Sequence, residues 1–281
     1  MQVRILVSAD ASALHQFLAP YCASSMFMLS NLAAAGIGYN GLVNQGEYLG
    51  AFDKDGLLCG VFVHYWNGNL MMQAPGAAAL QQLIEQGKTY FKRSVVGVLG
   101  PDDQALFVIE HFLKNESFTI NSSEGLYELP LDTFSEVTSV PEYMLVEACE
   151  VPGDLLARWM RAYEIEALGS CNDDRLNDRV RARVEAMKKG NCWSLLFQGV
   201  PVSLCGLNAC VGSSVQFGPV WTPPENRNKG YARVLLRFLL QELKKRGVII
   251  AYLFTNAPAA IRVYEAVGFR KIGTYRLAIV K

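Results

Sequence analysis

The sequence contains few of the residues from which metal sites are built. Its 3 histidines, His15, His64 and His111, lie far apart, and none of its 7 cysteines forms a C-x-x-C pair. Structural zinc sites need closely spaced pairs of these ligands. An odd number of cysteines scattered through apolar stretches is typical of reduced thiols in a reducing compartment. We therefore expect no metal cofactor.

An excess of charge of either sign is also absent. Lys and Arg number 26 and Asp and Glu number 26, so the formal net charge is zero. No overall electrostatic field then draws the protein to nucleic acid or to anionic lipid. We expect a small molecule as the partner, with no nucleic acid and no membrane, and we keep a homodimer open.

Long apolar runs are missing as well. Residues 1–8 lack the apolar stretch of a secretion signal, and no run approaches the length that spans a bilayer. Because 51% of the residues are hydrophobic and only 19% are charged, the chain has ample material for a core. These features predict a soluble globular protein of the cytoplasm.

Length and composition predict two domains. A chain of 281 residues exceeds the usual size of a single domain. The stretch 132–143 is polar and β-branched without a clear period, and Val140-Pro141 disfavours helix within it. We place the boundary there, with an N-terminal domain over 1–135 and a C-terminal domain over 143–281.

Hydrophobic period and turn residues predict the elements of each domain. In the first we expect helices and strands, in chain order, at 11–18, 27–35, 48–52, 57–65, 69–73, 77–86, 95–99, 101–114 and 126–131. In the second we expect them at 143–150, 154–168 with Asp154 as N-cap, 173–189, 193–197, 202–209, 215–222, 230–246, 248–254, 258–267 and 270–280. The domains repeat one order of elements, which predicts an α/β (α+β mixed sheet) class, each domain a twisted mixed sheet flanked by helices.

One segment of the second domain has the pattern of an anion site. Pro223 and Pro224 cannot donate to a sheet ladder, so the strand before them has to end or diverge from its neighbour. A polar loop with Gly230 then leads into a strongly amphipathic helix. Backbone N–H groups at such a helix start bind anions, and Arg227 and Lys229 add positive charge. The pattern favours a pyrophosphate over a single carboxylate.

The hexapeptide pattern R/Q-x-x-G-x-G/A has little weight by itself. It occurs twice in this chain, at 73–78 and at 227–232, and its residue types are common. The second copy differs from the first in its surroundings, which comprise the two prolines, the amphipathic helix and a tyrosine further along the chain.

With these surroundings, the second copy resembles the acetyl-CoA-binding motif of the GNAT N-acetyltransferase superfamily. In that family a splayed strand precedes the motif, and a strand, an Asn and a helix with a tyrosine before Gly-Phe follow it. Asn256, Tyr264 and Gly268-Phe269 stand at those places here, with Asn256 one residue further from Tyr264 than the commonest spacing. The resemblance covers 143–281.

The resemblance implies acetyl-CoA as cosubstrate and assigns its contacts. The splayed strand would pair with the pantetheine arm, and the loop with the start of the helix would hold the pyrophosphate. The residues implied are Val220, Trp221, Thr222, Arg227, Asn228, Lys229, Gly230, Tyr231, Ala232, Arg233 and Asn256.

The resemblance also implies direct transfer of the acetyl group to a primary amine of a small molecule or peptide. A backbone N–H near 220–222 would polarise the thioester carbonyl, and Tyr264 would act as general acid to the CoA thiolate. The base that takes the ammonium proton stays open among Glu164, Glu166, Asp173 and Asp174. A water-mediated route and an amine that arrives neutral are further alternatives.

The first domain shares the order of elements but lacks most of the motif. Gln73 replaces a cation, the loop at 73–78 has no Arg or Lys, and Leu113 stands at about the place of Tyr264. We interpret this domain as a degenerate GNAT-like domain that contributes packing and one wall of the acceptor cleft. The cluster 65–69 is either a ligand-facing group or a strand end with a turn.

Two further functions were compared with acetyl transfer. A non-catalytic acyl-CoA-binding sensor or scaffold protein would keep the fold and the loop, whereas Tyr264 and the intact loop favour an enzyme. An acyltransferase that takes aminoacyl-tRNA would want a basic surface, which zero net charge disfavours. The acceptor amine stays open.

Overall fold

The computed structural model describes residues 1–135 and 140–281. Residues 136–139 belong to the stretch in which the domain boundary is expected, and that part of the prediction lies outside the described residues. The described residues form helices and a mixed sheet, so the α/β class is confirmed.

The chain divides into two compact units whose residues are not strictly consecutive. Unit 1 comprises Met1–Leu126, Phe254–Asn256 and Ile272–Lys281, and unit 2 comprises Tyr127–Leu253 and Ala257–Lys271. The expected domains, 1–135 and 143–281, follow the chain, whereas the units divide the strands at 118–130, 250–255 and 270–280. The reason is that these three strands pair across the two halves of the chain.

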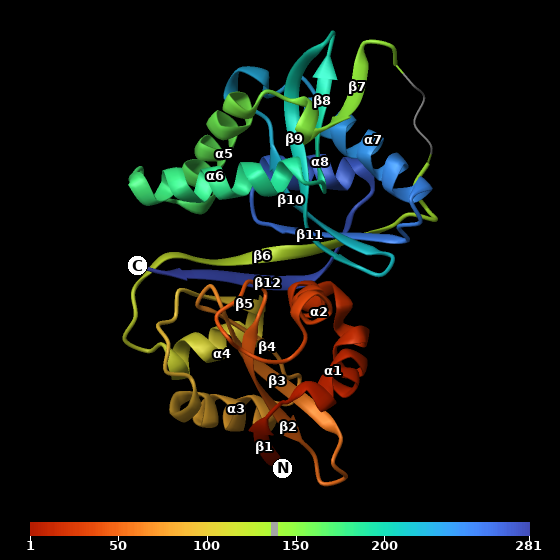
Figure 1. Ribbon diagram of the computed structural model, residues 1–281. Coiled ribbons are helices and arrows are strands. Elements are labelled where there is room, and N and C mark those ends of the chain that lie inside the picture. Colours follow the sequence, from red (N-terminus) through yellow and green to blue (C-terminus); the bar gives the residue numbers. More distant parts are fainter. Residues whose placement is uncertain (136–139) are drawn as a thin grey trace. The chain divides into compact units, whose positions relative to one another are not determined.

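Unit 1 is built mainly from the first half of the chain. Its helices are α1 (Ala11–Leu18), α2 (Cys22–Ala35), α3 (Ala77–Tyr90) and α4 (Asp102–Phe112). The strands of this half are β1 (Gln2–Ile5), β2 (Gly46–Phe52), β3 (Leu58–Tyr65), β4 (Asn69–Gln73), β5 (Gly97–Pro101) and β6 (Phe118–Pro130). The first four strands pair antiparallel in sequence order, and β4 pairs parallel with β5 (Figure 1).

Unit 2 repeats this order of elements. Its helices are α5 (Gly153–Leu168), α6 (Asp174–Lys188), α7 (Tyr231–Lys245) and α8 (Pro258–Val267). The strands of this half are β7 (Tyr143–Glu147), β8 (Cys192–Phe197), β9 (Val200–Val211), β10 (Ser214–Trp221), β11 (Ile250–Thr255) and β12 (Arg270–Val280). Strands β7 to β10 pair antiparallel in sequence order, and β10 pairs parallel with β11.

The last strand of each half pairs outside its own half. In unit 1 the strand order is β1-β2-β3-β4-β5-β12-β6, and β12 pairs antiparallel with β5 from Tyr275 opposite Pro101 to Ile279 opposite Gly97. In unit 2 the order is β6-β11-β10-β9-β8-β7. The sheet of unit 1 is therefore completed by residues that follow those of unit 2 in the sequence.

Helices cover both faces of the sheet in unit 2 (Figure 1). One buried cluster contains side chains of α7 and α8, among them Leu235, Leu239 and Tyr264. A separate cluster on the other face contains side chains of α5 and α6, among them Leu156 and Val180. This two-faced burial explains the period of apolar residues along the four helices.

One helical segment of unit 1 corrects the statement that no stretch could span a bilayer. The segment Ser8–Ala35 is long and apolar enough by length and composition. It consists of α1, a 3-10 turn with Pro20 and α2, and its residues Leu14, Leu18 and Met28 are fully buried. A core helix of a soluble protein passes the same test, so the segment is weak grounds for a membrane span.

Candidate functional site

Strands β10 and β11 separate partway along their length. Their parallel ladder covers Ser214–Gln216 and Ile250–Tyr252, and within residues 140–281 these two strands form no further pair. Beyond Gln216, β10 continues to Trp221 paired with β9 alone. The expected splayed strand is therefore present, and it diverges before Val220 rather than at the prolines.

A bulge in β10 accompanies this separation. The register with β9 shifts between Gln216 and Phe217 and again before Val220, around a cis peptide bond between Gly218 and Pro219. Gly218 has φ 152°, and a Cβ there would lie 2.3 Å from the Asn208 side chain. The φ value favours glycine at this point, because side chains rarely adopt this backbone conformation, and the bulge accompanies a local change in the strand.

The end of β10 holds Val220, Trp221 and Thr222. Trp221 is 5% exposed, and the edge of its ring faces Tyr163 of α5 at 6.1 Å between centroids. Its indole N–H has no acceptor in the described part of the chain. Thr222 Oγ1 lies 2.8 Å from Ser203 Oγ. A buried donor without a partner beside diverging strands indicates a place where a polar ligand group can be accepted.

The loop after β10 leads to α7 through backbone conformations that favour glycine and asparagine. After a 3-10 turn at Pro224–Asn226, Asn228 has φ 62° and Gly230 has φ 81°. A Cβ on Gly230 would have no neighbouring atom within 4 Å, so the positive φ and not protein crowding requires glycine there. This refines the prediction that Gly230 leaves room for a phosphate.

The start of α7 presents unpaired backbone donors. Within the described residues no side chain caps this helix, and the first backbone hydrogen bond runs from Val234 N to Gly230 O at 3.1 Å. The N–H groups of Tyr231, Ala232 and Arg233 therefore have no intrahelical acceptor. Lys229 and Arg233 are exposed, whereas Tyr231 is buried in the core. The arrangement fits an anion such as a pyrophosphate.

Arg227 is held by groups of the protein itself. Its two terminal nitrogens lie 2.9 Å from the two carboxylate oxygens of Glu166 on α5, and its Nε donates to the Thr222 carbonyl at 3.0 Å. Its guanidinium also lies over the Trp221 ring, 4.9 Å from the centroid. The charge expected to meet a phosphate is thus paired with a carboxylate.

Tyr264 lies on α8, in the buried cluster that α7 and α8 form with strands β10 and β11. It is 8% exposed and packs edge-on against Phe269, 5.8 Å between centroids. Burial raises the pKa of its phenol well above the ordinary value, and the nearby Cys205 thiol and Tyr163 phenol raise it further. Tyr264 is therefore a neutral hydrogen-bond donor at every physiological pH.

Comparison with known proteins identifies a domain in the second half of the chain. A model of the acetyltransferase (GNAT) family matches residues 154–269, which include β10, the loop, α7 and Tyr264. Residues 154–269 therefore form a GNAT acetyltransferase domain. The curated acetyltransferase Atu2258 of Agrobacterium fabrum is 42% identical over 55 residues, which are 20% of this chain and 40% of that protein.

Solved structures share the fold over nearly the whole chain. A GCN5-related N-acetyltransferase from Sphaerobacter thermophilus is 18% identical with a TM-score of 0.58, covering 99% of this chain and 94% of its own. A tandem GNAT protein from the clavulanic acid biosynthesis pathway is 13% identical with a TM-score of 0.52, covering 99% and 97%. A Drosophila protein is 14% identical with a TM-score of 0.68, covering 99% and 98%. At these identities the likeness shows the fold, here two tandem GNAT-like domains.

Each of the four carboxylates considered as base in this GNAT domain has a protein partner or a position at a helix start. Glu164 is 5% exposed and lies 3.5 Å from Arg183 and 3.9 Å from Arg179. Asp173 caps α6 by accepting from Leu176 N, and Asp174 begins that helix. Glu166 binds Arg227. None of the four stands out as the base.

Asn256 belongs to unit 1, whereas the other residues predicted to contact the cofactor belong to unit 2. Its side-chain amide donates to the hydroxyl of Ser122 on β6. The sequence also sets Asn256 apart, because it lies one residue further from Tyr264 than the commonest spacing of the motif.

Two polar groups at the start of the unit 1 loop at 73–78 have partners within the protein. The buried Gln73 side chain accepts from Ser24 at 3.0 Å and Ser25 at 3.2 Å, and the Ala74 N–H donates to Gln104 at 2.7 Å. Gly76 has φ −88°, unlike Gly230. The start of α3 is also uncapped, with its first backbone hydrogen bond from Leu80 N to Gly76 O, so this loop differs from the loop before α7 in backbone shape and in its lack of Arg and Lys.

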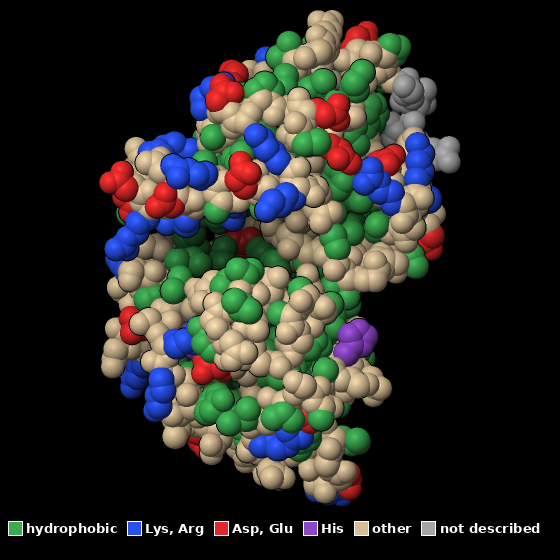
Figure 2. Space-filling view, viewed as in Figure 1, with side chains coloured by type: hydrophobic (Ala, Val, Ile, Leu, Met, Phe, Trp, Pro, Cys, Tyr) green, Lys and Arg blue, Asp and Glu red, His purple; other side chains and the backbone are tan. Residues whose placement is uncertain are grey.

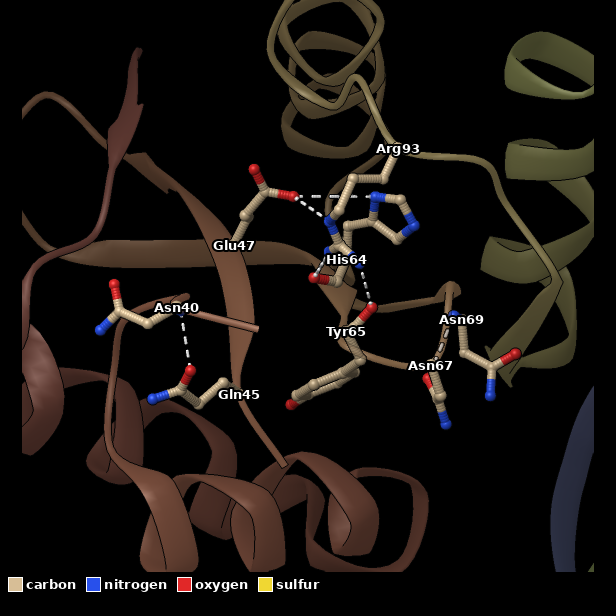
Figure 3. Close-up of polar contacts among 8 residues, drawn as sticks. All are labelled: Asn40, Gln45, Glu47, His64, Tyr65, Asn67, Asn69 and Arg93. Atoms are coloured by element: carbon tan, nitrogen blue, oxygen red, sulfur yellow. Dashed lines mark hydrogen bonds and ion pairs between the residues drawn. The ribbon is translucent and has the colours of Figure 1, made fainter. Parts of the chain in front are cut away.

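The cluster 65–69 is a strand end with a turn. Figure 3 shows the ring of Tyr65 turned away from Asn67 and Asn69. Tyr65 is 1% exposed with its hydroxyl 3.1 Å from that of Tyr48, and Gly68 has φ 80° in the turn. Of the two interpretations of this cluster, the structural one fits the contacts.

A basic groove lies elsewhere on unit 2, between α5 and α6. Figure 2 shows Lys and Arg side chains gathered over these helices. The groove is lined by Ala157, Val180 and Val184 and by the cations Arg158, Arg161, Arg181 and Lys188. Positive charge alone therefore does not distinguish the loop before α7, and its backbone geometry does.

Sequence reasoning missed two residues near the loops. Tyr163 contacts the Trp221 ring and contributes to the raised pKa of Tyr264, and its place on an amphipathic helix gave no sign of this. Gln104, which closes the loop of unit 1, is distant from it in sequence by 30 residues. Only the fold brings such partners together.

Proposed function

We propose that the protein is an acetyl-CoA-dependent N-acetyltransferase that moves an acetyl group to a primary amine of a small molecule or peptide. The observation that carries this proposal is the combination of diverging β10 and β11 with the uncapped start of α7. Such strands leave backbone groups for the pantetheine amides, and such a helix start leaves N–H groups for a pyrophosphate. The proposal concerns unit 2.

The residues of unit 2 fit the parts of this cosubstrate. Asn228 and Gly230 shape the loop, the N–H groups of Tyr231, Ala232 and Arg233 would bind phosphate oxygens, and Lys229 adds charge. Acetyl-CoA supplies the activated thioester. Backbone groups at 217–222 would orient its acetyl end against the amine.

Tyr264 would donate its phenolic proton to the departing thiolate. Direct attack of the amine forms the new C–N bond and breaks the C–S bond, so the sulfur needs a donor. A phenol whose pKa is raised by burial keeps its proton until the thiolate develops beside it. The amine loses its proton to water or arrives neutral, since the four carboxylates considered as base are engaged elsewhere or lie at the start of α6.

The acceptor is a small-molecule or peptide amine, without nucleic acid, metal or membrane, in the cytoplasm. The alternative function, a non-catalytic acyl-CoA sensor or scaffold, keeps every contact proposed for the loop and makes no use of Tyr264. The two functions differ in turnover and not in binding.

The test is a panel of primary amines with acetyl-CoA, in which release of free thiol is followed for the wild type and for Tyr264→Phe. Transfer to at least one amine, reduced in the variant, supports the enzyme. Binding of acetyl-CoA without transfer to any amine supports the sensor. Absence of binding would contradict both.

A further inference from the structure

The guanidinium of Arg227, in the loop before α7, contacts the Glu166 carboxylate of helix α5 and two groups at the end of β10 and just after it. We call these groups the Arg227 clamp: the Arg227 guanidinium, the Glu166 carboxylate, the Thr222 carbonyl and the Trp221 ring. The guanidinium makes a two-pronged ion pair at 2.9 Å, a hydrogen bond at 3.0 Å and a stacking contact at 4.9 Å. These contacts use both terminal nitrogens and the Nε of the side chain.

The clamp joins the loop before α7 to helix α5, although Arg227 and Glu166 are 61 residues apart in the sequence. Arg227 ends the 3-10 turn at Pro224–Asn226 and precedes the two residues with positive φ, Asn228 and Gly230. The ring of Trp221, which the Arg227 guanidinium covers, also packs against Tyr163 of helix α5. Side chains of α5 thus contact both the end of β10 and the loop that follows it.

We propose that Arg227 is a positioning residue, held by Glu166, and that it shapes the anion-binding loop without itself meeting the phosphates. The direct positive charge then comes from Lys229 and Arg233, which are exposed and form no ion pair in the described part of the chain. This inference rests on the function proposed above. It reverses the role that the motif assigns to Arg227.

An arginine is required for this role, because only a planar guanidinium can pair with both oxygens of Glu166 and stack on Trp221 at once. Lysine keeps the charge and loses the geometry. Arg227→Lys therefore separates the two roles: a phosphate ligand tolerates the change, and a clamp does not. Glu166→Gln also distinguishes the two roles. If Arg227 bound the phosphates directly, loss of the Glu166 carboxylate should tighten acetyl-CoA binding, whereas if Arg227 acts through the clamp, the same change should weaken it.

The experiment measures the loop in the free protein and binding in parallel. Amide hydrogen exchange of residues 222–233 without ligand should become roughly tenfold faster in both Arg227→Lys and Glu166→Gln. Calorimetric titration with acetyl-CoA should give a Kd roughly tenfold weaker for both variants. In turnover, the KM for acetyl-CoA should rise while kcat at saturation stays close to that of the wild type.

The matched control is the pair of Arg246 and Glu242 at the other end of α7, which are 2.9 Å apart and similarly exposed. Arg246→Lys should change neither exchange at 222–233 nor the Kd. Unchanged exchange in Arg227→Lys, or tighter binding in Glu166→Gln, would overturn the inference. If wild type binds no acetyl-CoA while the exchange of both variants rises, the proposed function fails and the clamp stands.

Discussion

The side-chain oxygen of Gln104 accepts a 2.7 Å hydrogen bond from the backbone N–H of Ala74, and both residues are buried. Ala74 lies in the loop of unit 1 that corresponds to the loop before α7 in unit 2. In unit 1 a side chain from α4 thus binds a backbone N–H at the start of this loop. This hydrogen bond contributes to the internal stability of unit 1.

Replacing Gln104 by Leu should therefore destabilise unit 1 without changing acetyl-CoA affinity. A buried N–H left without an acceptor lowers the free energy of unfolding by about 1–3 kcal/mol. Denaturant titration measures this change, and calorimetry measures the Kd. Gln81→Leu is the control, because Gln81 is exposed and its side chain donates to Glu85 on its own helix. A weaker Kd in Gln104→Leu would show that the loop of unit 1 takes part in binding.

Replacing Gly230 by Glu should abolish the stabilisation that acetyl-CoA gives against heat. The new carboxylate would stand where the phosphates are expected, and at a ligand concentration near 100 Kd the stabilisation lost is about 2.7 kcal/mol. Gly247→Glu is the matched control, since Gly247 has φ 87° and no atom within 4 Å of its Cβ position, at the far end of α7. An unchanged melting shift in Gly230→Glu would contradict the site.

Replacing Tyr264 by Phe should lower kcat by roughly 10²- to 10⁴-fold, the usual contribution of a general acid. The Kd for acetyl-CoA should change little. Because burial raises the pKa of Tyr264, no loss of activity from its ionisation should appear up to about pH 10. Tyr275→Phe, another buried tyrosine with a raised pKa, is the control in unit 1. Equal kcat in Tyr264→Phe and wild type would remove the proposed acid.

His64 should make unit 1 less stable in mild acid. Figure 3 shows its ring beside Glu47 and Arg93, and the Nδ1 lies 3.8 Å from the Glu47 carboxylate. Burial, with the charge of Arg93, lowers the His64 pKa to about 4 from 6.5. Between these values the unfolded chain takes up a proton that the folded protein does not, so stability falls as the pH drops from about 6.5 to about 4.

The loss across that interval is at most about 3 kcal/mol. Denaturation of His64→Gln and wild type at several pH values measures it, and the variant should show a flatter dependence. His111→Gln, which alters an exposed histidine, should keep the dependence of the wild type. The same slope in His64→Gln and wild type would assign the effect to other groups.

Local patterns were sufficient for most of the elements. The helices at 11–18 and 258–267 and the strands at 69–73 and 270–280 have the predicted bounds, because apolar period and turn residues coincide there. Asp173 was placed at the start of its helix, and it is the N-cap. Where a cap, a turn and an apolar face agree, the sequence alone is informative.

Elements defined by partners distant in the sequence were predicted less well. The strand β1 was not predicted, and β6 was predicted only from 126 although it begins at Phe118 in a polar stretch. The expected N-cap Asp154 is wrong, since Pro152 is the N-cap of α5. In each case sheet pairing or the preceding turn decided the structure, and neither leaves a local pattern.

The candidate site divides in the same way. The loop and Tyr264 could be identified from spacing, because the motif is continuous or nearly so. The partners of Arg227 and Asn256 could not, because Glu166 and Ser122 are 61 and 134 residues away. Roles that depend on such contacts, including that of Arg227, require the fold.

The pairing of β12 with β5 bears on how the protein is made. During synthesis the first half of the chain leaves the ribosome well before residues 272–281, which complete the sheet of unit 1. Until then β5 has an open edge, and open edges invite pairing with other chains. Unit 1 should therefore reach its final form only after the residues of unit 2 have been translated, and a fragment ending at residue 135 should aggregate.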